Sequence, residues 1–141
     1  MALACKNRGM PRASVLSTAF RTLFDPPARS AWRWCWALLC AVVAIAALTP
    51  ADSAPTMTPS DKIDHFLAFA ALAGAGALSM PDRLRNRLIV ATTMLAFGAG
   101  IEWGQTFVPG RFGDVADVLA DGVGVLLGLG AVWLLRRRLA A

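Results

Sequence analysis

Four apolar runs, each about as long as a membrane is thick, constrain the fold of this chain more than any other feature. They cover residues 31–49, 63–80, 88–107 and 115–135. A helix needs about 20 apolar residues to cross a hydrocarbon core of about 30 Å. The chain is 57% apolar, which is more than a soluble domain of 141 residues usually contains. The sequence therefore predicts an all-α membrane protein with four transmembrane helices.

Basic residues predict the orientation of these helices. Of the 14 Lys and Arg residues, 12 precede the first run or stand at its start (Arg33), lie between the second and third, or follow the fourth, and the other two are Lys62 and Arg111. Basic residues tend to stay on the cytoplasmic side of a membrane, so both termini are expected inside, as an even number of crossings requires. Short connections make neighbouring helices antiparallel. We therefore expect an antiparallel bundle with an N-in, C-in topology, in which the basic excess reflects topology and not a nucleic-acid partner.

The chain divides into one domain and two tails. Residues 1–30 are basic, contain three prolines and lack apolar periodicity, which predicts a mobile cytoplasmic tail. Residues 31–135 form the predicted four-helix transmembrane domain, and residues 136–141 form a short basic cytoplasmic tail. The basic start and first apolar run are also compatible with a secretory signal or an organelle transit peptide. Asp52, close to the candidate cleavage site, favours a first helix that is retained.

Ionisable and amide side chains gather at one end of the last three runs. Charged groups at membrane depth are costly and tend to be kept for a function. Helical spacing places the members from each run on one face, and the hairpin connections bring the three faces to one side of the membrane. The residues are Asp61, Lys62, Asp64 and His65 in the second segment, Glu102 and Gln105 in the third, Arg111 in the loop, and Asp114, Asp117 and Asp121 in the fourth.

Local signals mark the ends of these helices and their contacts. Ser60 or Asp61 is expected to cap the second helix and Asp114 the fourth, because a side-chain oxygen can accept a free backbone N–H group there. Two pairs of glycines have the spacing that lets helix backbones approach closely in lipid. They are Gly100 with Gly104, and Gly124 with Gly128.

Several chemical roles are open to the charged residues. Arg111 could pair bidentately with a carboxylate or bind an incoming anion, and Lys62 could do either as a point charge. His65 could carry a proton, bind a metal or donate a hydrogen bond. Alternatively, the polar groups simply hold the helices together, and helix capping explains Asp61 and Asp114. No cofactor or metal is assigned from the sequence.

The order and spacing of four short motifs resemble the VanZ-like family over about residues 58–135. Two positions depart from the family pattern, because Asp121 stands where Asn is expected and Phe69 where Tyr is frequent. The role of Asp121 is therefore left open. The motifs are Asp61-Lys62-(two residues)-His65-Phe66, Ile101-Glu102-(two residues)-Gln105, Pro109-Gly110-Arg111, and Asp114-(two residues)-Asp117-(six residues)-Gly124-(three residues)-Gly128.

The resemblance implies a small multi-pass protein of the bacterial inner membrane, in a family named for a teicoplanin-resistance component. It favours a cell-envelope protein that binds an envelope lipid head group, a wall precursor or a glycopeptide at an outward-facing polar site and thereby affects drug tolerance. The binding residues expected on this basis are Asp61, Lys62, His65, Glu102, Gln105, Arg111, Asp114 and Asp117.

Two other functions are compatible with the same residues. Clustered carboxylates with His65 could act as general acid and base, or bind a metal, in an enzyme that acts on a lipid-linked phosphate. Proton or cation movement is the least favoured, because the charges stop about halfway along the helices and no internal repeat pairs them.

Overall fold

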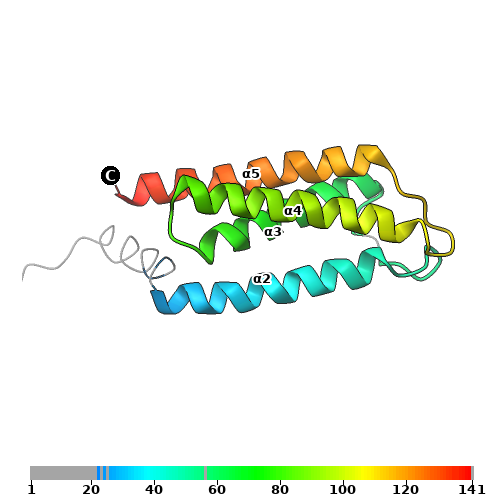
Figure 1. The fold of residues 1–141 in the computed structure, drawn as a ribbon, viewed down its shortest axis with the longest axis horizontal. Helices are drawn as coiled ribbons and strands as arrows, with labels where there is room; N and C mark the ends of the chain where they lie inside the picture. Colours follow the sequence, from blue (N-terminus) through cyan, green and yellow to red (C-terminus); the bar gives the residue numbers. More distant parts are fainter. Residues whose placement is uncertain (1–21, 23, 25, 56, 141) are drawn as a thin grey trace, which may run out of the picture.

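The computed structural model of this protein is a bundle of long helices (Figure 1). It describes residues 22, 24, 26–55 and 57–140, so most of the predicted N-terminal tail lies outside the described residues. No strand occurs among the residues that it describes. The helices are α2 (Pro26–Ala47), α3 (Asp61–Leu78), α4 (Leu84–Gln105) and α5 (Val115–Ala140).

The helices extend beyond the apolar runs that predict them. Helix α2 already begins at Pro26, because proline is tolerated in the first helical turn, where its missing N–H group would have no partner. Helix α5 continues through the basic residues 136–138 to Ala140, so most of the segment assigned to a C-terminal tail is helical. The apolar pattern therefore locates each helix but not its ends, since charged residues also make helical hydrogen bonds.

The capping predictions have different outcomes at α3 and α5. Asp114 caps α5 as expected, because its Oδ1 accepts the N–H of Ala116 at 2.8 Å. The prediction for Ser60 is wrong, since its side chain makes no capping bond. Its backbone carbonyl instead accepts the N–H groups of Ile63 and Asp64 at 3.0 and 3.1 Å.

Helices α3 and α5 form the most intimate pair in the bundle. A Cβ atom added at Gly124 would collide with the carbonyl of Phe66, and one added at Gly128 would collide with the carbonyl of Ala70. The predicted close approach at this glycine pair is therefore confirmed. Gly100 behaves differently, because no atom of the described chain lies within 4 Å of a Cβ added there.

The core lies between α3, α4 and α5, and many apolar side chains remain outside it. Phe69, Leu72, Val90, Met94 and Val125 are buried at its centre. Residues 27–47 of α2 and 115–139 of α5 are long and apolar enough to cross a membrane. Helices α3 and α4 do not meet the same criteria of length and composition, so the described residues contain two candidate spans where the sequence predicts four.

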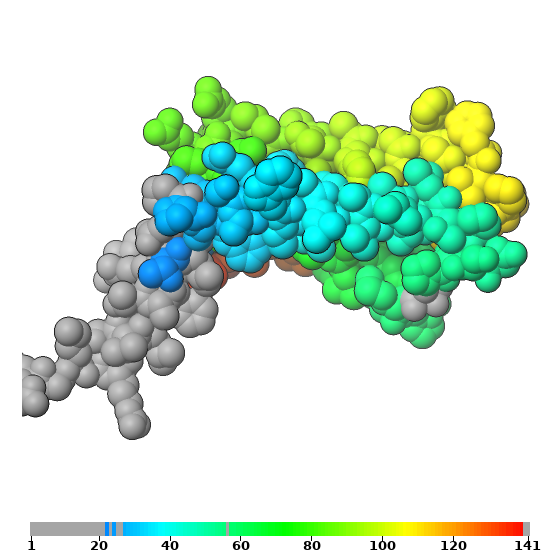
Figure 2. Space-filling view, turned by 90° about the horizontal axis from the view of Figure 1, so that it is seen from below, coloured from blue at the N-terminus to red at the C-terminus, as the bar shows by residue number. Residues whose placement is uncertain are grey.

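The polar ends of α3, α4 and α5 lie together at one end of the bundle, as the sequence predicts (Figure 1). The C-terminal ends of α2 and α4 lie beside the N-terminal ends of α3 and α5, at the right of Figure 1, and we call this the site end. The two loops at the site end meet where the N–H of Ala51 donates to the carbonyl of Pro109 at 3.4 Å. Helix α2 packs against α3 and α4, and Figure 2 shows it lying across one face of the bundle.

At the opposite end, a basic side chain closes the C-terminus of α3. The guanidinium of Arg136 donates from Nη2 to the carbonyls of Ala77 and Met80, at 2.9 and 3.0 Å. Cations are favourable at a helix C-terminus, because they satisfy the last free carbonyls and the helix dipole. The two ends of the bundle therefore differ in charge, with carboxylates gathered at the site end and arginines at the other.

Candidate functional site

A buried histidine–aspartate pair lies at the deepest point of the site end. Nδ1 of His65 on α3 lies 2.9 Å from Oδ1 of Asp121 on α5. The His65 side chain is 9% exposed and that of Asp121 is fully buried. The close approach of the two helices brings these residues together, and Asp121 also lies against Gly98 of α4, where a side chain would have no room.

Glu102 connects this pair to the start of α5. Its Oε2 accepts the N–H of Asp114 at 2.7 Å. Its Oε1 lies 3.7 Å from Nε2 of His65 and has no hydrogen-bond partner among the described residues, although it is buried. Only one oxygen of this carboxylate is therefore used in fixing the fold.

Lys62 is the cation that pairs with the carboxylates of α5. Its Nζ lies 2.8 Å from Oδ2 of Asp114 and 3.1 Å from Oδ1 of Asp117. The Lys62 ammonium, helped by the N–H of Ala116, holds the pKa of Asp114 below its usual range. Asp117 is buried, whereas the Lys62 and Asp114 side chains are about half exposed.

Gln105 and Arg111 attach the end of α2 to the rest of the site. Nε2 of Gln105 donates to the carbonyl of Ala47, and Nε of Arg111 donates to the carbonyl of Thr49, both at 3.2 Å. Within the described part of the chain, no carboxylate lies within 4.0 Å of the Arg111 guanidinium. Of the two cations at the site end, Lys62 therefore pairs with carboxylates, and Arg111 keeps most of its donors free for other partners.

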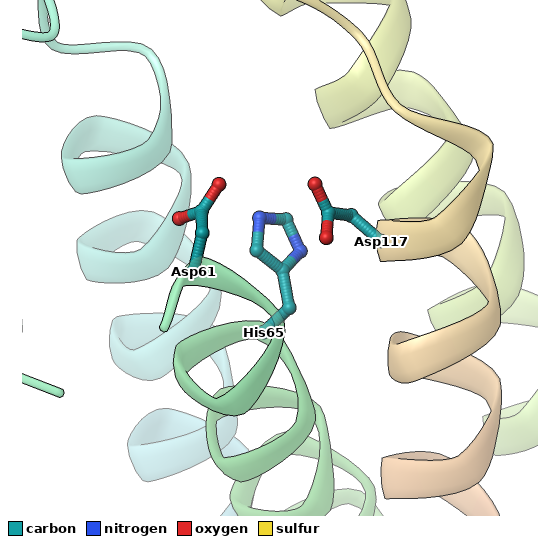
Figure 3. A group of neighbouring side chains, drawn as sticks. All are labelled: Asp61, His65 and Asp117. Carbon is teal, nitrogen blue, oxygen red and sulfur yellow. The ribbon is translucent and has the colours of Figure 1, made fainter. Parts of the chain in front are cut away.

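Three side chains converge in front of the histidine (Figure 3). The imidazole of His65 lies between the carboxylates of Asp61 and Asp117, and one donor atom from each of the three lies within 4.8 Å of the others. Asp61 is exposed at the start of α3, whereas His65 and Asp117 are buried. Carboxylate and imidazole groups at this separation can share a proton or a cation.

Two adjoining pockets open at the site end. One, of about 290 Å³, is predominantly polar and includes Lys62, Asp114 and Asp117 in its lining. The other, of about 220 Å³, lies between α2, α3 and α4 and is lined mainly by apolar side chains such as Val43 and Phe69. Asp61, Gln105 and Arg111 border both pockets.

The eight residues predicted for the site all lie at this end, and seven of them line a pocket. Glu102 is the exception, because it lies beneath the pockets and contacts His65. The seven are Asp61, Lys62, His65, Gln105, Arg111, Asp114 and Asp117.

Asp121 is the residue that the predicted site lacks. The family pattern that the chain resembles favours Asn at this position, yet the carboxylate of Asp121 lies 2.9 Å from Nδ1 of His65 and orients the ring. The signal in the sequence was its position seven residues after Asp114, which continues the same helical face to greater depth. The apolar pocket beside His65 was also missed, since the rotation of α2 against α3 cannot be read from either helix alone.

An all-helical bundle with two candidate membrane spans and many exposed apolar side chains is typical of a small membrane protein. The comparison with protein families gives the specific assignment. The VanZ/LLP1 family model matches residues 14–136, and the chain belongs to this family. Neither the curated proteins nor the solved structures include a significant match.

Proposed function

We propose that this protein spans the bacterial inner membrane four times, N-in and C-in, and binds a phosphate-bearing envelope lipid at its outward-facing site end. The single observation that carries the proposal is the junction of a polar pocket with an apolar one. A ligand that fills both must have a polar head and an apolar chain, which is the chemistry of a lipid.

The surface of the bundle supports the four-span part of this proposal. Large apolar side chains point outward along the helices, including Ile45 at 69% and Leu126 at 70% exposure. A soluble protein rarely exposes such contiguous apolar surface, whereas lipid would cover it. Helices α3 and α4 contain 18 and 22 residues, so they are roughly 27 and 33 Å long at 1.5 Å per residue and match the hydrocarbon core.

The donors of Arg111, and not the overall charge of the polar pocket, favour an anionic head group there. This guanidinium borders both pockets and uses Nε to hold the Thr49 carbonyl, which leaves its paired terminal donors for a ligand. Arginine presents its donors in a planar fork that matches the oxygens of a phosphate. The lipid chain then lies against Val43 and Phe69 in the apolar pocket.

The test is the binding of a polyprenyl phosphate to the full chain in detergent, measured by native mass spectrometry. Arg111→Ala should weaken binding by roughly ten-fold or more, the effect of losing a hydrogen bond to a charged group. Arg85→Ala, at the opposite end, is the matched control and should bind as wild type does. Equal binding by wild type and Arg111→Ala, or no binding by either, contradicts the proposal.

Such binding also links the protein to drug tolerance. If the lipid carries a wall precursor, occupying it at the outer face alters how a glycopeptide reaches its target. Expression of the wild-type chain should then change the teicoplanin tolerance of a susceptible host, and Arg111→Ala should abolish the change while the protein remains in the membrane.

A second candidate function, an enzyme acting on the same lipid phosphate, is favoured by the contacts of His65. Asp121 orients the ring, and Nε2 lies 3.7 Å from Oε1 of Glu102, which is the arrangement of a general acid or base. Glu102→Gln should then abolish release of phosphate from a polyprenyl phosphate. Full turnover by that variant would remove Glu102 from any such mechanism.

A further inference from the structure

One ring nitrogen of His65 is hydrogen-bonded to a carboxylate, as is common for histidines that bind a metal through the other nitrogen. This nitrogen, Nδ1, lies 2.9 Å from the fully buried carboxylate of Asp121. When Nδ1–H donates to that carboxylate, the lone pair is on Nε2, at the opposite side of the ring. In metal sites a carboxylate in this position fixes the tautomer and orientation of the histidine that binds the ion.

Nε2 of His65 faces oxygen atoms and no hydrogen-bond donor among the described residues. Donor atoms of Asp61 and Asp117 lie within 4.8 Å of the histidine and of each other, on either side of the ring (Figure 3). Independently of that group, Oε1 of Glu102 lies 3.7 Å from Nε2. The Glu102 side chain is only 8% exposed, and within the described chain this oxygen has no hydrogen-bond partner.

Three carboxylates are buried close to His65, and buried negative charge has to be compensated by positive charge. Glu102, Asp117 and Asp121 are 7%, 3% and 0% exposed, and leaving a buried carboxylate uncompensated costs several kcal/mol. Lys62 reaches Asp117 but neither Glu102 nor Asp121. His65 stands between those two carboxylates, so positive charge at its ring, from a proton or from a bound cation, would compensate both.

We infer that the site end binds a divalent transition-metal ion of the zinc type, through Nε2 of His65 and the carboxylates of Asp61 and Asp117. Imidazole nitrogen favours zinc and its neighbours over magnesium or calcium, and carboxylates complete such sites. Bonds of about 2.0–2.2 Å require the three donors to move slightly closer, which the exposed Asp61 can do.

The ion would lie where the two pockets adjoin, because His65 lines the apolar pocket, Asp117 the polar one and Asp61 both, and it would add a positive charge to the site end. An anionic head group could then bind to the metal as well as to Lys62 and Arg111. The metal site goes beyond the proposed lipid binding and does not depend on it, because the ion alone can be tested.

The test is a calorimetric titration of Zn²⁺ into the full chain in detergent after chelator treatment, with bound zinc checked by elemental analysis. We expect saturable binding of one ion per chain. Asp61→Asn should weaken zinc binding by roughly ten-fold or more, since removing a ligand should cost at least as much as removing an outer-shell partner. Asp61 is exposed, so this variant keeps the buried core intact.

Asp52→Asn is the matched control, because Asp52 is an exposed acid in a loop at the same end. It should bind zinc as wild type does. Asp121→Asn should weaken binding through the orientation of His65, again by about 10–100-fold. The inference is overturned if wild type shows no saturable zinc binding, as a protonated His65 between two carboxylates would predict. It is also overturned if Asp61→Asn binds zinc as tightly as wild type.

Discussion

At the scale of single residues, the ammonium group of Lys62 holds the first turns of α3 and α5 together. It lies within 3.1 Å of two carboxylates, although half of its side chain is exposed to solvent. Exposed ion pairs contribute little individually because water screens them. Here the buried Asp117 needs a partner, so Lys62 matters more than its exposure suggests.

Acid should remove the contribution of Asp114 to stability. Its pKa in the folded protein is lowered by the Lys62 ammonium and the Ala116 N–H, so its stabilising effect is present above the unfolded-state pKa and is lost as the pH falls through the folded-state pKa. Asp114→Asn should therefore be less stable than wild type at about pH 7, and the difference should shrink as the pH falls below about 4. Thermal unfolding in detergent measures both.

Asp52→Asn is the control for this pH series, since the Asp52 side chain is exposed and has no ion-pair partner among the described residues. It should follow wild type across the same pH range. A deficit of Asp114→Asn that persists unchanged in acid would show that charge at Asp114 is not what stabilises the fold.

At the scale of helices, glycine fixes how closely α5 can approach α3. Gly124 and Gly128 lie against the backbone of α3, whereas Gly130, one half-turn further, has no atom of the described chain within 4 Å of an added Cβ. Glycine therefore permits close helix packing at two positions of α5 and makes no such contact at a third. The four-residue spacing in the sequence identifies the first two positions but does not explain the third.

Gly128→Ala should destabilise the bundle by about 1–3 kcal/mol, the usual cost of inserting a methyl group into packed structure. The neighbouring variant Gly130→Ala is the control and should be neutral or slightly stabilising, because alanine is the better helix former. Unfolding in a denaturing detergent series measures the difference. Equal stability of the two variants would mean that α5 can move away from α3 without cost.

Periodicity and turn signals predicted the four helices and the end at which the polar residues meet. They also identified Asp114 as a cap, because a carboxylate directly before an apolar run has a local partner. Partners across helices could not be predicted, since the choice between Lys62 and Arg111 depends on helix rotation. The contact of Asp121 with His65 could not be predicted for the same reason, since it joins residues 56 positions apart.

At the scale of the whole molecule, the distribution of charge predicts which end faces the cytoplasm. Arginines gather around Arg136 at one end, and carboxylates gather at the site end. Because basic residues resist translocation, the site end should face outward and the loop between α3 and α4 inward.

Cysteine labelling tests this orientation in intact cells. After Cys5, Cys35 and Cys40 are replaced, Ser53→Cys should react with a membrane-impermeant maleimide from outside. Arg83→Cys, in the loop at the other end, should react only after the membrane is permeabilised. Both positions are exposed, so accessibility within the fold does not explain a difference. The reverse pattern would invert the topology and place the pocket in the cytoplasm.

The contacts of Lys62 also bear on how the chain is made. A ribosome synthesises α3 more than 30 residues before Asp114 and Asp117 emerge, yet these are the carboxylates that Lys62 pairs with. If α3 spans the membrane as we propose, it enters the translocon without its counter-charges, whereas α5 is long and apolar enough to cross a membrane. Stable insertion of α3 should wait for α5, so a nascent chain that stops before Val115 would be a substrate for membrane quality control.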